Sequence, residues 1–141
     1  MGPVSRSAAT LRVRGETLDP DQITYALGSE PTRAHRKGES LSSRSRNLAP
    51  QGLWLLEVDD RAPADIDGQI EQILNQLTTN LSVWGDISSR LGIDLYVALF
   101  MTDTNQGLEI SVESLKMLTD RSILLALDLY GPDYDLSIGD A

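Results

Sequence analysis

The sequence predicts an α+β fold, a two-layer α/β sandwich in which helices pack on a β-sheet. Segments with strand-like alternation are interleaved with segments of helical periodicity, and the 141 residues suit one domain. Hydrophobic residues make up 40% of the chain, which suffices for a core without disulfides or metal ions. A capped helix follows a strand at two places, which indicates two βαβ-like halves. One arrangement of this kind is a ferredoxin-like plait with an inserted long helix and an extra strand, and strand order is left open.

The first predicted elements are a strand and a capped helix. Residues 10–14 alternate between apolar side chains and polar ones that include two arginines, which indicates a half-buried strand. Asp19 is followed by proline and, three positions later, by Gln22, which is the spacing of a capping box. A helix should therefore begin there, and Gly28 can adopt the left-handed conformation that ends it.

A long loop and a buried strand come next. Residues 29–51 are rich in Ser, Arg, Gly and Pro and lack apolar periodicity, which predicts a loop of the kind that often carries function. Residues 53–58 have apolar side chains on both faces of the predicted strand, with Trp54 among them. We therefore expect this strand near the centre of the sheet.

A single long helix is expected between Ile66 and Leu91. Apolar residues recur there at three- and four-residue spacings over about seven turns. Weak helix formers favour a kink or break near residues 79–85, and Gly92 would end the helix.

The last third of the chain predicts three strands and a helix. Residues 93–101 are almost entirely apolar, as in a central strand covered on both faces. Residues 108–110 suggest a short strand, after which Ser111 can cap a helix that runs through Leu118. Residues 123–130 predict the final strand.

We expect three segments along the chain: a disordered N-terminus at residues 1–8, a single domain at 9–130 and a flexible acidic tail at 131–141. The longest apolar run, residues 95–101, is about a third of the length that crosses a membrane. The first residues lack the apolar segment of a signal peptide, and cysteine is absent, as in reducing compartments. The sequence thus predicts a cytoplasmic, bacterial-type protein with no membrane association.

Charge is distributed unevenly along the chain. The net charge is −9, yet residues 1–50 hold eight Lys/Arg against five Asp/Glu, and residues 51–141 hold four against sixteen. The acidic balance argues against nucleic acid as a partner. A basic cluster in the long loop could still bind a phosphate or an acidic partner, or could be a solvated loop: Arg33, Arg36, Lys37, Arg44 and Arg46.

Residue types that carry catalysis or bind metals are scarce. His35 is the only histidine, and no nucleophile signature accompanies it. Thiolate zinc sites are excluded because there is no cysteine. Residues 103–107 resemble half of a calcium loop, but Ser114 stands where the loop needs a bidentate glutamate, which favours a plain turn. We therefore expect no catalytic residue, metal or cofactor.

Short motifs over most of the chain are similar to those of one family. They are Leu-Arg-Val-Arg-Gly from Leu11, Leu-Asp-Pro-Asp-Gln-Ile from Leu18, Glu-Pro-Thr-Arg from Glu30, Arg-Lys-Gly-Glu from Arg36, Gly-Leu-Trp from Gly52 and Leu-Asp-Leu-Tyr from Leu127. As an ordered set from about Ala9 to Tyr130, they resemble the bacterial domain-of-unknown-function family 4279. The resemblance implies no established activity. It does imply a candidate functional or structural cluster of recurrent residues, Pro31, Lys37, Gly38, Gly52 and Trp54.

The candidate binding site combines the basic loop with the tryptophan of the second predicted strand. If the loop folds back over the end of the sheet, it places positive charge beside an aromatic ring and forms a shallow pocket for an anion. The residues assigned to this site are Arg33, His35, Arg36, Lys37 and Trp54. In the competing interpretation, Gly and Pro only shape the loop and the tryptophan fills the core.

Three functions are compatible with the sequence. The first is a non-catalytic interaction protein, similar to an immunity protein or antitoxin, which binds a basic protein or a second copy of the chain. The second is a sensor that binds a small molecule or anion through the basic loop at residues 33–46. The third is a hydrolase, which would need a close pair of buried acids. Homodimerisation is left open because sheet edges need covering.

Overall fold

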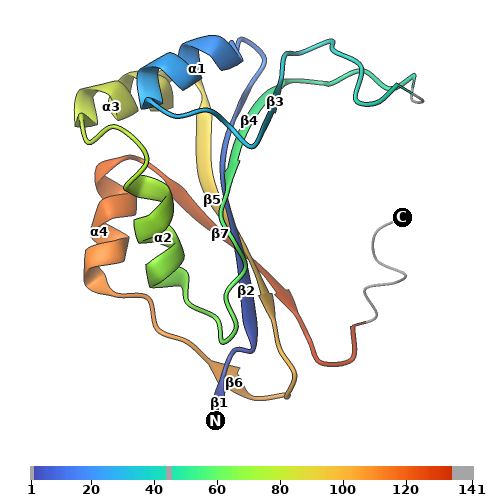
Figure 1. Ribbon diagram of the computed structural model, residues 1–141, viewed down its shortest axis with the longest axis vertical. Helices are drawn as coiled ribbons and strands as arrows, with labels where there is room; N and C mark the ends of the chain where they lie inside the picture. Colours follow the sequence, from blue (N-terminus) through green and yellow to red (C-terminus); the bar gives the residue numbers. More distant parts are fainter. Residues whose placement is uncertain (1, 44–45, 135–141) are drawn as a thin grey trace.

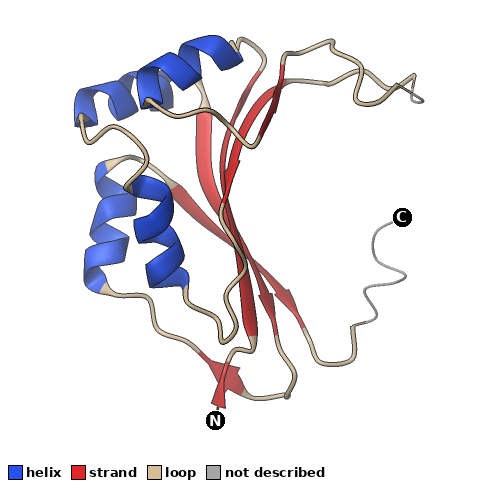
Figure 2. Ribbon diagram, in the orientation of Figure 1, coloured by secondary structure: helices blue, strands red, loops and turns tan. Residues whose placement is uncertain are grey.

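A mixed five-stranded sheet carries helices on one face and leaves the other face open (Figures 1 and 2). The computed structural model describes residues 2–43 and 46–134. All neighbouring strands of this sheet are antiparallel except β5 and β7, which are parallel. A short parallel pair, β1 (Gly2–Pro3) and β6 (Gln106–Gly107), lies at one end of the molecule. Across the sheet the order is β3 (Arg33–His35), β4 (Gly52–Glu57), β2 (Arg6–Gly15), β5 (Gly92–Phe100) and β7 (Leu124–Tyr130).

Each described helix begins after a residue whose side chain accepts a hydrogen bond from a backbone nitrogen of the first turn. The helices are α1 (Pro20–Leu27), α2 (Ile66–Leu74), α3 (Leu81–Arg90) and α4 (Val112–Asp120), and their capping residues are Asp19, Asp65, Asn80 and Ser111. Gly28, at the end of α1, has a φ of 83°. The local predictions for the start and end of the first helix, and for the start of the last one, are therefore confirmed.

The core lies between the sheet and the helices. Alternate residues of β2, β4 and β5 point into it, because side chains in a strand alternate between the two faces. Trp54 of β4 and Trp84 of α3 are its largest fully buried side chains. Each indole nitrogen donates a hydrogen bond, from Trp54 to Thr24 Oγ1 at 3.1 Å and from Trp84 to the Thr78 carbonyl at 2.9 Å. This layering confirms the predicted α+β sandwich.

The prediction of a single long helix over residues 66–91 is wrong, because this segment forms two separate helices, α2 and α3. Residues 75–80 separate the two helices, slightly before the expected position of the break, and Gly85 lies within α3. The Thr78 nitrogen donates to the Leu27 carbonyl at 2.9 Å, which ties the connection to α1. Both helices pack on the same core, so their apolar stripe is continuous and its period does not show the break.

Only the second of the two expected βαβ-like halves is a parallel unit. There β5 leads through α4 to β7, and the two strands are neighbours rather than split by another strand as in a ferredoxin-like plait. In the first half, α1 leads through β3 to β4, which pairs antiparallel with β2. Residue patterns do not specify which strands become neighbours, so this detail depended on tertiary structure.

Residues 2–8 are ordered, whereas disorder was expected for residues 1–8. From its second residue the chain forms β1, and β2 begins at Arg6. Val4 is buried, and its nitrogen donates to the Gly107 carbonyl at 3.1 Å. The sequence analysis missed this because the partners lie about a hundred residues away. At the other end, Tyr134 packs edge-on against Tyr130, whereas residues 135–141 of the expected tail lie outside the described residues.

The long loop over residues 29–51 contains a strand that the sequence did not reveal. β3 has three residues and pairs with the outer edge of β4. A strand this short has too few positions for alternation to show, and it forms because β4 offers an unpaired edge. The short strand expected at residues 108–110 lies slightly earlier, as β6.

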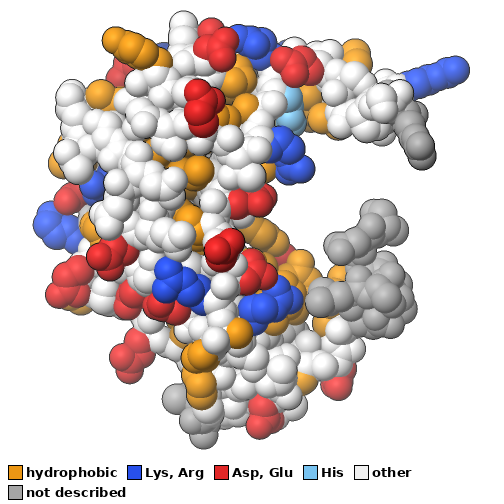
Figure 3. Space-filling model, viewed as in Figure 1, with side chains coloured by type: hydrophobic (Ala, Val, Ile, Leu, Met, Phe, Trp, Pro, Cys, Tyr) orange, Lys and Arg blue, Asp and Glu red, His pale blue; other side chains and the backbone are white. Residues whose placement is uncertain are grey.

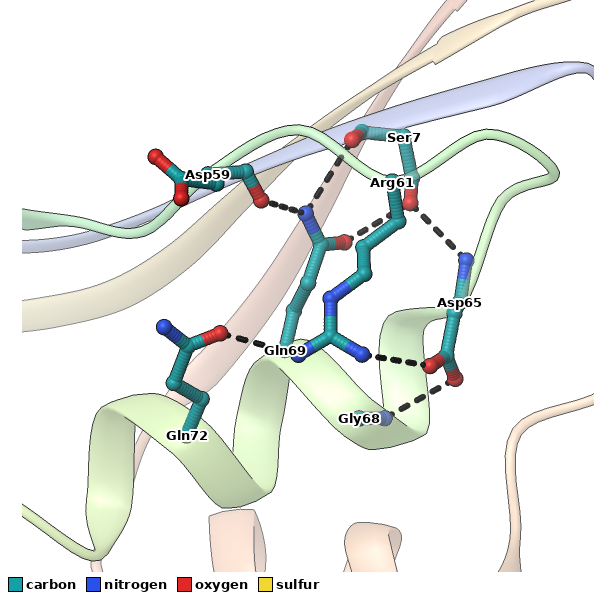
Figure 4. A network of polar contacts seen from close by, with 7 residues as sticks. All are labelled: Ser7, Asp59, Arg61, Asp65, Gly68, Gln69 and Gln72. Carbon is teal, nitrogen blue, oxygen red and sulfur yellow. Dashed lines mark hydrogen bonds and ion pairs between the residues drawn. The ribbon is translucent and has the colours of Figure 1, made fainter.

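A buried polar network joins α2 to β2 (Figure 4). Gln69 is 0% exposed, and its amide oxygen accepts a hydrogen bond from Ser7 Oγ at 2.7 Å. Its amide nitrogen donates to the carbonyls of Ser7, at 3.1 Å, and Asp59, at 3.0 Å. At the rim of this network, Arg61 pairs with the helix-capping Asp65 at 3.0 Å. All polar atoms of the Gln69 side chain thus have partners, as burial requires.

A second polar contact connects α2 to the start of α4 and leads to a pH-dependent prediction. The Asp67 carboxylate accepts hydrogen bonds from the Ser111 nitrogen at 3.0 Å and from Ser114 Oγ at 2.7 Å. Burial alone would raise the pKa of Asp67, but these hydrogen bonds outweigh it and lower the pKa. A lowered pKa in the folded state stabilises the protein at neutral pH, and this contribution is lost as pH falls through that pKa.

Replacing Asp67 by asparagine should therefore lower the free energy of unfolding by about 1 kcal/mol at neutral pH. The difference from the wild type should shrink in acid, because protonation removes the same charge from the wild-type carboxyl. Urea denaturation at pH 7 and near pH 3 measures both values. Asp86→Asn is the control, since Asp86 is exposed and pairs only with Arg90 one turn away, at 3.2 Å. An effect of Asp67→Asn that is constant with pH would contradict this account.

Candidate functional site

The face of the sheet turned away from the helices carries charged and aromatic side chains on all five strands. Residues directly opposite one another in a sheet share a face, so the strand register defines the rows on this open face. One row crosses the whole sheet: Arg33, Leu55, Arg12, Asp94 and Leu124. One neighbouring row consists of His35, Leu53 and Arg14. The row on the other side consists of Glu57, Thr10, Tyr96 and Ala126. None of the four helices in the described residues covers these rows (Figure 2).

A basic cavity lies at the β3 end of the open face. Its volume is about 360 Å³. The basic side chains around it come from β2 and β3, and its apolar part comes from β4 and the segment before it. The lining residues are Arg12, Arg14, Arg33, His35, Leu41, Pro50, Gln51, Leu53 and Leu55. We call this space the basic cavity.

One wall of the basic cavity is an arm formed by residues 36–43 and 46–51, which projects beyond the sheet (Figure 1). Gly38 has a φ of 86°, a conformation that favours glycine, and its nitrogen donates to the Ala49 carbonyl at 2.9 Å. The Ala49 nitrogen donates to the Glu39 carbonyl at 2.8 Å, so the two sides of the arm pair with each other. The predicted loop is therefore a paired arm in its described parts, and Figure 3 shows the molecular surface hollowed beneath it.

Asp94 holds two of the arginines that line the basic cavity. It is buried, and it accepts two hydrogen bonds from Arg12, both at 2.7 Å, and one from Arg14 at 2.9 Å. The hydrogen bonds and the charge of Asp94 raise the pKa of Arg12. Arg33, in contrast, is exposed and has no carboxylate partner within the described part of the chain. One carboxylate thus pairs with two of the three arginines that line the cavity, which leaves the cavity positively charged.

Two tyrosines and an aspartate extend the polar row towards β7. Asp128 accepts hydrogen bonds from the hydroxyl groups of Tyr96 and of Tyr130, the latter at 2.9 Å. The bond to Asp128 and burial raise the pKa of Tyr96 far above its usual value, so this tyrosine stays neutral. The guanidinium of Arg12 lies 4.6 Å from the centre of the Tyr96 ring. Contacts therefore run without a gap from the basic cavity to the far edge of the sheet.

Two of the five residues assigned to a site from the sequence line the basic cavity, namely Arg33 and His35. Trp54 lies on the opposite face of the sheet, fully buried among the helices. Strand alternation explains this, because Ala34 is the residue of β3 that pairs with Trp54 and its two neighbours must point the other way. The expected pocket beside the tryptophan therefore does not form.

The other two assigned residues are bound by acids near α1. Arg36 lies 2.7 Å from Asp19 and 3.2 Å from Asp21. These carboxylates, Asp21 most of all, raise the pKa of Arg36. Lys37 lies 3.4 Å from Glu16. Both cations face the start of α1 rather than the cavity, and Arg44 of the same predicted cluster lies outside the described residues.

Sequence reasoning missed Arg12, Arg14 and Asp94 as members of the site. A signal for the two arginines was present, because alternation placed both on the polar face of the first strand. Asp94 is the one charged residue within the apolar run at 93–101, and an unexplained charge in a central strand points to a buried partner. Only the register of β2 against β5 shows that this partner is Arg12.

The buried and clustered acidic residues of the described chain are few. Among residues 2–43 and 46–134, Asp94 is the only buried carboxylate, and it is paired with arginines, so the hydrolase hypothesis gains no support. The same residues hold no cluster of three acidic or histidine side chains that could bind a metal ion. No helix in the described chain is long and apolar enough to span a membrane.

Comparison with known proteins gives one match. Residues 5–132 match the family described as Domain of unknown function (DUF4279). No curated protein and no solved structure matches the chain. The match includes all the strands and helices around the open face. Since it covers nearly the whole chain, the protein belongs to the DUF4279 family.

Proposed function

We propose that the protein is a binding module for a small organic anion, which it holds in the basic cavity on the open face of the sheet. The observation that carries this proposal is the exposed guanidinium of Arg33, which has no carboxylate partner among the described residues and lies beside Arg12 and Arg14 in a chain of net charge −9. Arginine presents several N–H donors in a plane, and this geometry matches carboxylate and phosphate oxygens. Asp94 neutralises only part of the positive charge of the three arginines, and a bound anion would neutralise more of it.

The apolar part of the cavity indicates what else the ligand carries. Leu53 and Leu55 lie between the arginines of β2 and Arg33 of β3, and Leu41 and Pro50 of the arm face the same space. A volume of about 360 Å³ is at the lower end of the range for small-molecule sites. We therefore expect a carboxylate or phosphate ester with a small aromatic or aliphatic group, rather than an inorganic ion or a long polyanion.

Calorimetric titration and thermal denaturation test the proposal with four probes: benzoate, phenyl phosphate, acetate and inorganic phosphate. A ligand that binds only the folded protein raises its melting temperature by mass action. Benzoate and phenyl phosphate should bind and raise the melting temperature, and they should do so at lower concentrations than acetate and inorganic phosphate. Equal effects of all four probes would overturn the role of the apolar part, and the absence of any effect would overturn the proposal.

Arg33→Ala should weaken binding of phenyl phosphate at least about tenfold, because a hydrogen bond to a charged group contributes roughly 1.5–3 kcal/mol. The fold should not change, since this side chain is exposed and has no ion-pair partner in the described chain. Arg36→Ala is the matched control on the same segment, because Arg36 pairs with Asp19 and Asp21 away from the cavity. Wild-type affinity in Arg33→Ala, or an equal loss in both variants, would place the ligand elsewhere.

A protein-binding role is a second proposal, and one observation supports it. Exposed apolar side chains gather on α4 and β7, at the edge of the sheet opposite the basic cavity. Exposed apolar patches on folded proteins commonly mark contact surfaces.

We also propose a cytoplasmic location, which the absence of cysteine supports.

A further inference from the structure

The edge of the sheet at β7 is the most apolar exposed region of the described chain. Ten large apolar or aromatic side chains are exposed in the described residues, and half of them lie on two adjacent elements, β7 and α4. They are Val112, Leu115, Leu124, Leu127 and Leu129. We call these five residues the β7 surface. Leu115, Leu127 and Leu129 also line one shallow cavity of about 420 Å³, which shows that they are neighbours in space.

The two edges of the sheet differ in how they are protected. β3 is an edge strand of three residues, it includes Arg33 and His35, and the arm follows it. Short length and charge are devices that prevent an edge from pairing with another chain. β7 is seven residues long and contains neither lysine nor proline, and among the described residues it pairs regularly with β5 on one side only. Its outer backbone groups therefore present a regular edge to a further strand.

Charge argues that this edge meets a second copy of the chain rather than a basic protein. Asp128 is the only charged residue of β7, and its carboxylate already accepts hydrogen bonds from Tyr96 and Tyr130. A basic partner would form few ion pairs with β7, even though the chain as a whole is acidic. Two chains of net charge −9 repel each other, so a contact between copies requires a surface with few charges. The β7 surface meets this requirement.

We propose that two copies of the protein pair through antiparallel β7 strands about a twofold axis at Leu127. In this register Leu127 faces its own counterpart, and Leu125 faces Leu129 of the other copy on the helix side of the sheet. On the open face, Ala126 faces Asp128 of the other copy, so the two carboxylates are not opposed. An axis at Asp128 would place these charges directly opposite each other, which is unfavourable.

The dimer extends features already present in one chain. Its two sheets join into one continuous sheet, and the leucines of β7 continue the apolar layer of the core across the axis. Both α4 helices lie on the same side of the joined sheet, so Val112 and Leu115 approach their counterparts. The contact is isologous, as in most homodimers. The two basic cavities lie at the far edges of the joined sheet, so dimerisation leaves ligand binding unchanged.

Analytical ultracentrifugation at micromolar concentration tests the oligomeric state. The wild type should sediment with twice the mass of one chain, and Leu127→Lys should sediment with the mass of a single chain. Leu81→Lys on α3 is the matched control and should stay dimeric, because Leu81 is 46% exposed and Leu127 is 44% exposed. Circular dichroism and phenyl phosphate binding check that Leu127→Lys is folded. A monomeric wild type, or dissociation caused equally by both substitutions, would overturn the proposal.

A cysteine cross-link tests the register, and the natural chain has no cysteine to interfere. Residues that face each other across antiparallel strands have Cα atoms about 4.5–5.5 Å apart, which a disulfide can span. Under oxidising conditions Leu127→Cys should form a covalent dimer. Leu124→Cys should not, because residue 124 faces Tyr130 of the other copy. Efficient cross-linking at residue 124 and none at residue 127 would overturn the proposed axis.

Discussion

Replacing Gln69 by leucine should lower the free energy of unfolding by about 3 kcal/mol, a large fraction of the roughly 5–15 kcal/mol that is typical of a folded domain. Leucine keeps most of the volume of the side chain but has no polar atoms. The hydroxyl of Ser7 loses its acceptor, and the Asp59 carbonyl loses the amide that donates to it. A buried polar group left without a partner costs roughly 1–3 kcal/mol. The melting temperature should fall by roughly 10 °C.

Urea denaturation measures this loss, with Gln72→Leu as the control on the same helix. Gln72 is exposed, and its amide oxygen accepts a hydrogen bond from Arg61 at 2.9 Å, so its replacement should cost well under about 1 kcal/mol. In the Gln69→Leu background, Ser7→Ala should cost less than in the wild type, because the bond to Gln69 is already lost and Ser7 Oγ keeps only the bond from the Asp65 nitrogen, at 3.0 Å. Equal losses in the two glutamine variants would show that the network contributes little to stability.

Replacing Asp94 by asparagine should lower the free energy of unfolding by about 2 kcal/mol. The same substitution should strengthen binding of an anion in the basic cavity. Asparagine is nearly isosteric but neutral, so Arg12 and Arg14 lose the charge that both contact. The Arg12 side chain is only 24% exposed, so water replaces this charge poorly. An anion in the basic cavity can replace it.

Thermal denaturation with and without phenyl phosphate measures both effects. The ligand should raise the melting temperature of Asp94→Asn by more than that of the wild type. Asp60→Asn is the control, because Asp60 is 49% exposed and pairs with Arg6 at 2.6 Å, outside the cavity. Exposed pairs contribute about 1 kcal/mol at most, and the ligand should act on this variant as on the wild type. A smaller ligand effect in Asp94→Asn than in the wild type would contradict the proposed site.

Several features of the candidate site could be predicted in part from the sequence. The basic character of residues 33–37 was visible, and so was the position of both arginines on the polar face of the first strand. The grouping was not predictable, because it depends on which face of β3 each residue occupies. Pairing of Ala34 with Trp54 directs Arg33 and His35 to the open face, whereas acids near α1 hold Arg36 and Lys37 away from it.

By itself, the sequence determined the features that depend on neighbours along the chain. These are the capped starts of α1 and α4, the left-handed glycine at residue 28, the apolar strands and the α+β class. Caps and alternation act over a few residues, so a single sequence contains them. The sequence also indicated a break between α2 and α3, although slightly too late in the chain. Tertiary structure alone decided the ordered N-terminal strand, the strand order and the row from Arg33 to Asp94. These depend on contacts between residues far apart in the sequence, and each forms only when a distant strand or helix offers its partner.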